Sequence, residues 1–168
     1  MIIRRKLPKE PQSIVVYSDS DWAGEKDRRS ISGNVIMFGG DIISYKSKKQ
    51  TLIALSTFEA ELIAMVSATQ QALYIKNLLK FFRLKTEPEV KVLVDNQAVI
   101  NCFKKKEATK RSKYIDIRYL YMLQKHQRSD IKVSYVKSED NIADILTKNV
   151  SRKAFETLSE RMIGESMN

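Results

Sequence analysis

The first third of the chain alternates short apolar runs with polar breaks, which is typical of β-strands. Residues 13–17 (SIVVY) form a β-branched run suited to a strand that is buried on both faces. The runs 31–38 and 41–47 follow and are separated by Gly39-Gly40, a pair that favours a tight hairpin because both glycines accept positive φ. The pattern therefore predicts three strands in an antiparallel meander before any helix.

The apolar spacing changes to a helical period after residue 55. Ser56 and Glu59 match a capping box, so Glu59 is expected to be a capping partner. The helix is expected to continue to about Arg83. Beyond it, the pattern predicts a strand at 90–94, helices at 96–103 and 114–127, a strand at 131–136, a helix at 141–148 capped by Asp140, and a last helix at 151–161.

This order of elements predicts an α/β fold. Strands that are joined through helices pair in parallel, so the expected sheet is mixed and five-stranded, with three antiparallel strands, two parallel ones and helices on both faces. The chain divides into a linker at 1–12, a main domain at 13–150, and a C-terminal helix and tail at 151–168.

Composition narrows the classes of function. With 168 residues, 43% of them hydrophobic and 30% charged, the chain is expected to form one globular domain. No apolar run approaches the roughly 20 residues of a membrane span, and residues 1–12 lack the apolar segment of a signal peptide. The single cysteine, Cys102, is expected to be a small apolar residue. The formal net charge of +10 favours a polyanionic partner such as nucleic acid.

Four acids stand where the predicted elements converge. Asp19 and Asp95 each follow an apolar strand, and ligands of open α/β sheets bind beyond the carboxyl ends of the strands. Glu61 lies in the second turn of the long helix, and Asp144 in the first turn of the helix after the last strand. Crowded carboxylates repel one another unless they are protonated or bind cations. Oxygen ligands without histidine or cysteine suit Mg²⁺ or Mn²⁺, and paired ions of this kind serve phosphodiester chemistry.

Five blocks, in order, resemble the ribonuclease H domain of copia-type LTR retrotransposon polyproteins. They are YSDSDWAG (17–24), SKKQTLIALSTFEAELIA (47–64), VDNQAVI (94–100), SKYIDIRY (112–119) and EDNIADILTK (139–148). The resemblance spans roughly residues 15–148 and implies a ribonuclease H-like fold. It places the catalytic acids, which are also the metal ligands, at Asp19, Glu61, Asp95 and Asp144.

The resemblance also implies a reaction. A ribonuclease H is an endonuclease that hydrolyses the RNA strand of an RNA:DNA hybrid, with two Mg²⁺ ions (Mn²⁺ can substitute) as cofactors. By analogy, Asp19 would bridge both ions, Glu61 and Asp95 would complete one site, and Asp144 the other. The implied partners are the hybrid and an adjacent reverse transcriptase domain in a polyprotein, with no membrane. The implied location is the cytoplasm, within retrotransposon virus-like particles.

Two features depart from the family pattern. Many ribonucleases H carry a histidine in the loop before the last catalytic aspartate, and here the loop 137–140 has none. Tyr114 stands where relatives of this type often have histidine.

Further residues have expected roles. Asn96 and Gln97, beside Asp95, are expected to bond RNA 2′-hydroxyls. Asp21 is expected to be a turn residue, Trp22 a buried packing residue, and His126 a surface residue of a helix. The expected phosphate contacts form two basic patches, one of Lys46, Lys48 and Lys49, the other of Lys104, Lys105, Lys106, Lys110, Arg111 and Lys113.

Two other functions remain open at this point. The first is a catalytically weak or inactive module of the same fold that binds nucleic acid or supports a reverse transcriptase, and the missing loop histidine favours it. The second is a receiver-like phosphoacceptor domain, in which acids also cluster at strand ends. Such domains alternate strand and helix from the start, so the three predicted strands before the first helix argue against it.

Overall fold

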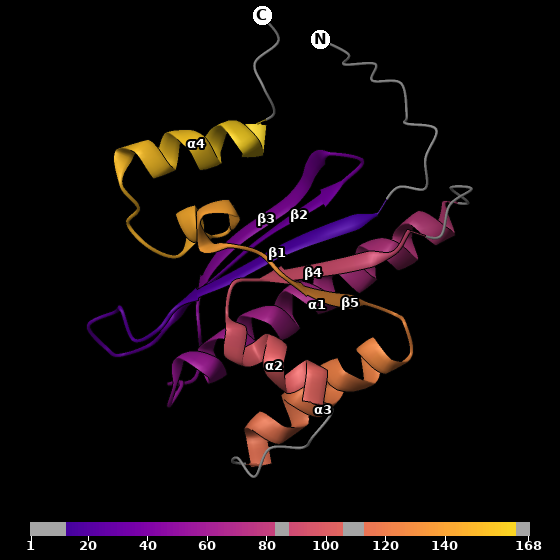
Figure 1. Cartoon of the computed structure of the whole chain (residues 1–168), viewed down its shortest axis with the longest axis horizontal. Coiled ribbons are helices and arrows are strands. Elements are labelled where there is room, and N and C mark those ends of the chain that lie inside the picture. Colours follow the sequence, from indigo (N-terminus) through magenta and orange to yellow (C-terminus); the bar gives the residue numbers. More distant parts are fainter. Residues whose placement is uncertain (1–12, 83–87, 106–112, 164–168) are drawn as a thin grey trace, which may run out of the picture.

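The computed structural model describes residues 13–82, 88–105 and 113–163, and its centre is a mixed sheet of five strands (Figure 1). In space the order is β3-β2-β1-β4-β5. The first three strands pair antiparallel, and β4 and β5 join in parallel, as predicted. The predicted linker at 1–12 lies outside the described residues. The strands are β1 (Ile14–Asp21), β2 (Ile31–Phe38), β3 (Asp41–Lys49), β4 (Val90–Val94) and β5 (Lys132–Tyr135).

Helical elements cover both faces of this sheet (Figure 1), which confirms the predicted α/β architecture. On one face lie α1 (Thr57–Phe81), α2 (Gln97–Lys105) and α3 (Lys113–Gln127). On the other lie two 3₁₀ turns, η1 (Ser138–Asp140) and η2 (Asp144–Leu146), and the helix α4 (Arg152–Ile163). None of the described helices combines the length and the hydrophobicity that a membrane span requires.

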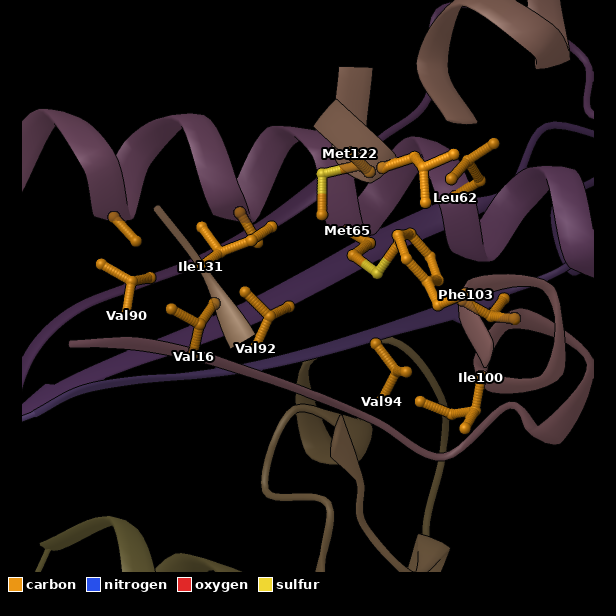
Figure 2. Close-up of a cluster of buried hydrophobic side chains, with 14 of the residues drawn as sticks. Val16, Leu62, Met65, Val90, Val92, Val94, Ile100, Phe103, Met122 and Ile131 are labelled. Carbon is orange, nitrogen blue, oxygen red and sulfur yellow. The ribbon is translucent and has the colours of Figure 1, made fainter. Parts of the chain in front are cut away.

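The larger core lies between the sheet and α1 (Figure 2). Alternate residues of β1 and β4, such as Val16 and Val92, point into it and are fully buried. Leu62 and Met65 of α1 and Met122 of α3 meet them from the other side. Cys102 packs against this core, as expected of a small apolar residue.

A smaller core lies on the opposite face. Its buried centre consists of Val35 of β2, Ile142 just before η2, and Leu158 of α4. This cluster attaches α4 to the sheet and holds the 3₁₀ turns between the two.

The start of α1 is held by the predicted capping box. The Ser56 hydroxyl accepts a hydrogen bond from the Glu59 amide (3.2 Å), and the Glu59 carboxylate accepts one from the Leu55 amide (2.8 Å). The capping role of Glu59 is confirmed. Because the cap defines the first turn, it also sets the direction of Glu61 in the second.

The first strand is longer than predicted. Its apolar run ends at Tyr17, but β1 continues to Asp21 because β2 pairs with it along its whole length. The parallel pairing with β4 ends earlier, at Tyr17 and Leu93. Asp19 therefore lies inside β1, opposite Gly33 of β2, rather than beyond the strand end.

The predicted helix at 141–148 is wrong, because this segment forms turns with the single 3₁₀ turn η2 in it, and η1 precedes it. The Asn141 side chain donates a hydrogen bond to the Ser18 carbonyl of β1 (3.2 Å), which holds the segment against the sheet. Asp140, the predicted cap of that helix, instead pairs with Arg161 of α4. Gly33 permits this close approach, since a Cβ there would lie 2.6 Å from the Thr147 methyl carbon.

Candidate metal centre and nucleic-acid surface

Three carboxylates from three elements converge at one end of the sheet. Asp19 comes from β1, Glu61 from α1, and Asp95 from the position after β4. One carboxylate oxygen of each lies within 4.8 Å of the other two. Asp19 and Glu61 are 2% and 6% exposed, so their negative charges are largely withdrawn from water. Among the described residues, this is the one group of three or more acids, histidines or cysteines with the spacing of a metal site.

Asp144 is linked to this group through a lysine. The Lys148 ammonium lies 2.9 Å from a carboxylate oxygen of Asp144 and 3.7 Å from one of Asp19. Asp144 itself, the first residue of η2, falls outside the group of three. Sequence reasoning missed Lys148, although it lies one turn after Asp144 in the last of the resembling blocks.

The site favours protonated acids in the absence of cations. Burial, with the Asp19 and Asp95 carboxylates beside it, raises the pKa of Glu61 to about 8. Burial and the nearby Asp19 raise the pKa of Asp144 to about 6. Burial also raises the pKa of Asp19, although Thr147 and Lys148 act in the opposite direction. Burial lowers the pKa of Lys148, but the surrounding carboxylates outweigh it and leave that pKa above its usual range.

The residues fit a divalent cation. One carboxylate oxygen of Glu61 and one of Asp144 are buried without a hydrogen-bond partner, which is unfavourable for a carboxylate unless a cation or a proton is supplied. The ligand atoms are all carboxylate oxygens, which suit Mg²⁺ or Mn²⁺ better than Zn²⁺.

Three donors orient the acids, and two of them come from side chains that sequence reasoning missed. The Thr147 hydroxyl donates to Asp19, and the Ser138 hydroxyl donates to Asp95 (2.6 Å). The Ser20 amide donates to Glu61 (3.3 Å). Ser138 lies in the loop where many ribonucleases H carry a histidine. Its place in that loop was the feature of the sequence that could have indicated a role for it at the site.

Asn96 and Gln97 lie beside Asp95, as their positions in the sequence require. The Asn96 side-chain oxygen accepts hydrogen bonds from the amides of Ala98 (2.9 Å) and Val99 (3.2 Å), so Asn96 caps α2. Gln97 is the exposed first residue of that helix. The cap occupies the side-chain oxygen of Asn96, whereas the side-chain NH₂ group remains available to donate hydrogen bonds.

The first predicted basic patch lies on the edge strand β3. Lys49 is already paired, 2.7 Å from Glu25 and 3.6 Å from Asp27. Lys46 and Lys48 are exposed and have no ion-pair partner among the described residues. In the second patch, Lys104 is exposed on α2. The side chains of Lys105 and Lys113, and the whole of Lys106, Lys110 and Arg111, lie outside the described part of the chain.

Three remaining expectations have mixed outcomes. Trp22 is 45% exposed, so its predicted burial is wrong; its ring is held at the surface by a hydrogen bond to the Ala54 carbonyl (2.9 Å). Asp21 is the last residue of β1 and pairs with Ile31 of β2, so its predicted place in a turn is wrong, and the turn begins at the next residue. His126 is half-buried in α3, edge-on to the Phe103 ring at 6.0 Å, and is more enclosed than a surface residue.

Comparison with known sequences points to retrotransposons. The "Retrovirus-related Pol polyprotein from transposon TNT 1-94" of Nicotiana tabacum is 36% identical over 153 residues, which cover 90% of this chain. The match takes up 11% of that relative, so this chain spans about a tenth of its length. Comparison with protein-family profiles gives no match.

Comparison with solved structures points to one fold. LC11-RNase H1, isolated from compost by a metagenomic approach, has a TM-score of 0.60 at 17% identity, covering 86% of this chain and 96% of that one. The same protein in complex with an RNA/DNA hybrid has a TM-score of 0.59 at 20% identity, with coverage of 85% and 99%. A foamy viral protease-reverse transcriptase in complex with dsDNA has a TM-score of 0.52 at 15% identity, with coverage of 86% and 96%. Over 90% of its length, therefore, the chain is similar to a segment of a retrotransposon Pol polyprotein, and its fold is that of ribonuclease H.

Proposed function

We propose that the chain is a ribonuclease H, an endonuclease that hydrolyses the RNA strand of an RNA:DNA hybrid with two Mg²⁺ ions. The observation that carries this proposal is the convergence of Asp19, Glu61 and Asp95, with oxygens within 4.8 Å of one another, in a ribonuclease H fold. That the structural neighbour LC11-RNase H1 binds an RNA/DNA hybrid supports the choice of substrate.

Each acid has a distinct part in this proposal. Asp19 is central, because it lies between the Glu61 and Asp95 carboxylates on one side and Asp144 on the other. Glu61 and Asp95 would hold one cation together with Asp19, and Asp144 would complete the second site, also with Asp19. When bound, such ions polarise the scissile phosphate and lower the pKa of the attacking water.

Lys148 balances charge when cations are absent. Its ammonium contacts Asp144 and Asp19, where positive charge is otherwise lacking. Cation binding at Asp144 therefore requires Lys148 to turn away. Its half-exposed side chain can reach water when it does so.

Recognition of the substrate falls to groups around the acids. The Asn96 amide and Gln97 lie next to Asp95 and are suited to bond 2′-hydroxyls, the groups that distinguish RNA from DNA. The unpaired ammonium groups of Lys46 and Lys48 are suited to contact phosphates. In the proposed setting, the chain works beside a reverse transcriptase domain of a polyprotein, in cytoplasmic virus-like particles. The likeness to a foamy viral protease-reverse transcriptase supports that partner.

A second candidate is a module of the same fold that binds hybrid without cutting it. The observation that favours it is the Lys148 ammonium, which already neutralises part of the acid cluster. Hybrid binding without cleavage, in either Mg²⁺ or Mn²⁺, would select this candidate.

The experiment that distinguishes the two candidates measures cleavage of an RNA:DNA hybrid whose RNA and DNA strands carry different labels. The wild-type chain in Mg²⁺ is expected to shorten the RNA strand alone, and Asp95→Asn is expected to abolish cleavage because it removes one ligand charge. Asp130→Asn is the matched control, since Asp130 is paired with Lys125 outside the acid cluster. Equal cleavage by wild type and Asp95→Asn would overturn the assignment.

A further inference from the structure

Asp21 is an acid at the same end of the sheet to which the metal centre gives no role. It follows Asp19 by two residues in β1, so both side chains lie on one face of the strand, with their Cα atoms roughly 6.6 Å apart. Tyr17, on the same face, packs in the smaller core with residues of η2. Asp21 therefore continues the row of β1 side chains on the face from which Lys148 reaches Asp19.

The Asp21 carboxylate has no partner within the described chain, where it forms neither a hydrogen bond nor an ion pair. It occupies space beside Gly24 that a Cβ at that position would need. The other acids of the loop after β1 differ, because Glu25 and Asp27 both pair with Lys49, at 2.7 and 3.6 Å. Of the three acids at positions 21–27, Asp21 is thus the one that can still accept a cationic side chain.

Lys148 and Asp21 line the same cavity, which has a volume of about 350 Å³. One wall comes from the end of β1 and the loop after it, and the other from η2 and the residues that follow η2. The Lys148 side chain is 39% exposed, and its ammonium ends a flexible four-carbon stem. The ammonium can therefore turn from the acids into this cavity by side-chain rotation, without a movement of the backbone.

The ammonium of Lys148 and a cation at Asp144 compete for the same oxygens. The ammonium lies 2.9 Å from Asp144 and 3.7 Å from Asp19, and a second positive charge at that distance repels it. An ammonium that turns into water loses its ion pairs, whereas one that turns towards Asp21 exchanges them for a new one. Asp21 thus offers the lysine a second position, farther along the same strand.

We propose that Asp21 is a positioning residue, which receives the Lys148 ammonium when a divalent cation binds at Asp144. The inference rests on the proposed function, because it concerns a cation of the same site. It gives Asp21 no part as a ligand of that cation. The Asp21 carboxylate acts on the cation through the lysine, by holding the ammonium away from Asp144.

The first test is a calorimetric titration with Mg²⁺, without nucleic acid, at about 0.15 M salt, where charges more than about 8 Å apart are largely screened. Asp21→Asn is expected to weaken Mg²⁺ binding about two- to fivefold, which corresponds to the loss of one partly exposed ion pair. Asp27→Asn is the matched control. It removes the same charge from the following loop, outside the cavity, and should leave the affinity unchanged. An Asp21→Asn protein with wild-type affinity overturns the proposal.

A double-mutant cycle with Lys148 separates the positioning role from direct coordination and from a purely structural role. In a Lys148→Met background there is no ammonium to receive, so Asp21→Asn is expected to leave Mg²⁺ affinity unchanged. Direct coordination by Asp21, or a structural role, instead predicts the same loss of affinity in both backgrounds. An equal loss in the two backgrounds therefore overturns the proposal.

The position of the lysine provides a second readout, in crystals of the wild-type chain soaked in Mn²⁺. The Lys148 nitrogen is expected within about 4 Å of an Asp21 oxygen, the distance of an ion pair. A bound cation with Lys148 pointing into solvent overturns the proposal. Mg²⁺ affinity that does not depend on Asp21 removes this proposal and leaves the nuclease assignment intact. A wild-type chain that binds no Mg²⁺ overturns the metal centre itself, and this proposal with it.

Discussion

At the scale of single residues, charge burial dominates the acid cluster. Glu61 is buried beside the Asp19 and Asp95 carboxylates, and its unpartnered oxygen receives no donor from the described chain. The pKa of Glu61, about 8, reports this balance: without cations the folded state keeps a proton that an unfolded chain would release. The ionised cluster thus destabilises the fold until a cation binds.

The first prediction concerns pH and stability. Because the pKa of Glu61 is about 8 when folded and 4.5 for a glutamate in water, the folded state holds more protons between these values. The free energy of unfolding should therefore fall as pH rises from about 4.5 to about 8, by up to about 1.4 kcal/mol per pH unit for each extra proton. Asp144, with a pKa of about 6, contributes with the same sign in the lower part of that window.

Urea denaturation in a chelator, repeated at several pH values, measures this slope. Glu61→Gln is expected to flatten it, and saturating Mg²⁺ is expected to remove the loss at high pH because the cation stabilises the ionised acids. Stability that rises between pH 5 and about 8 in the metal-free wild type would contradict the electrostatic account.

A second prediction at this scale concerns Lys148, whose ammonium competes with a cation for Asp144. Lys148→Met is expected to raise Mg²⁺ affinity by about tenfold, since a hydrogen bond to a charged group contributes about 1.5 kcal/mol. Calorimetric titration measures the affinity. Lys125→Met, which breaks a surface pair with Asp130, is the matched control and should change nothing. Weaker Mg²⁺ binding by Lys148→Met would mean that the lysine supports the ion instead.

At the scale of elements, local patterns predicted the regular strands and helices, and long-range contacts decided the rest. The Gly39-Gly40 hairpin and the Ser56 cap are local, and the structure has both, with positive φ at the two glycines. The extension of β1 beyond Tyr17 depends on pairing with β2, and no apolar run in the sequence indicates this extension. The turns η1 and η2 depend on a bond between Asn141 and β1, across more than a hundred residues.

The same distinction applies to the candidate site. The four acids could be found because each follows an apolar run or lies early in a predicted helix, although Asp19 in fact lies inside β1 and Asp144 in η2. The sequence could not indicate the roles of Lys148, Thr147 and Ser138. These roles follow from contacts with the acids that appear only in the folded chain.

A prediction at this scale concerns Gly33, the residue over which η2 lies. A Cβ at this position would lie 2.6 Å from the Thr147 methyl carbon and 3.0 Å from the Ala143 carbonyl oxygen, so η2 would have to move. Gly33→Ala is expected to destabilise the fold by about 1–3 kcal/mol and to weaken Mg²⁺ binding, since Asp144 moves with η2.

The control for this prediction is Gly40→Asn in the hairpin. Its φ of +86° tolerates asparagine best among non-glycine residues, and a Cβ there meets nothing within 4 Å. Thermal unfolding and Mg²⁺ titration of both variants make the comparison. Unimpaired metal binding by Gly33→Ala would show that the position of η2 does not matter for the site.

At the scale of the whole molecule, the acids lie where two separate cores meet. The core under α1 supports Glu61, and the smaller core under α4 supports the segment with Asp144. The sheet between them carries Asp19 and leads into Asp95. Metal affinity should therefore depend on how the two faces of the sheet are held together.

Leu158→Ala tests this dependence, because Leu158 attaches α4 to the smaller core. We expect a loss of about 2–5 kcal/mol in stability and a measurable loss of Mg²⁺ affinity. Ile131→Ala is the matched control: it truncates a buried residue of the larger core before β5, at the end of the sheet away from the acids, and should lower stability without changing metal affinity. Equal affinities in the two variants would contradict the link between α4 and the site.

The most direct test of the central claim is a crystal structure of the chain soaked in Mn²⁺, with the ion located by its anomalous signal. We predict a signal among the carboxylates of Asp19, Glu61 and Asp95, and a Lys148 side chain that has left Asp144. A map with no signal at these acids, and with Lys148 still bonded to Asp144, would contradict the account.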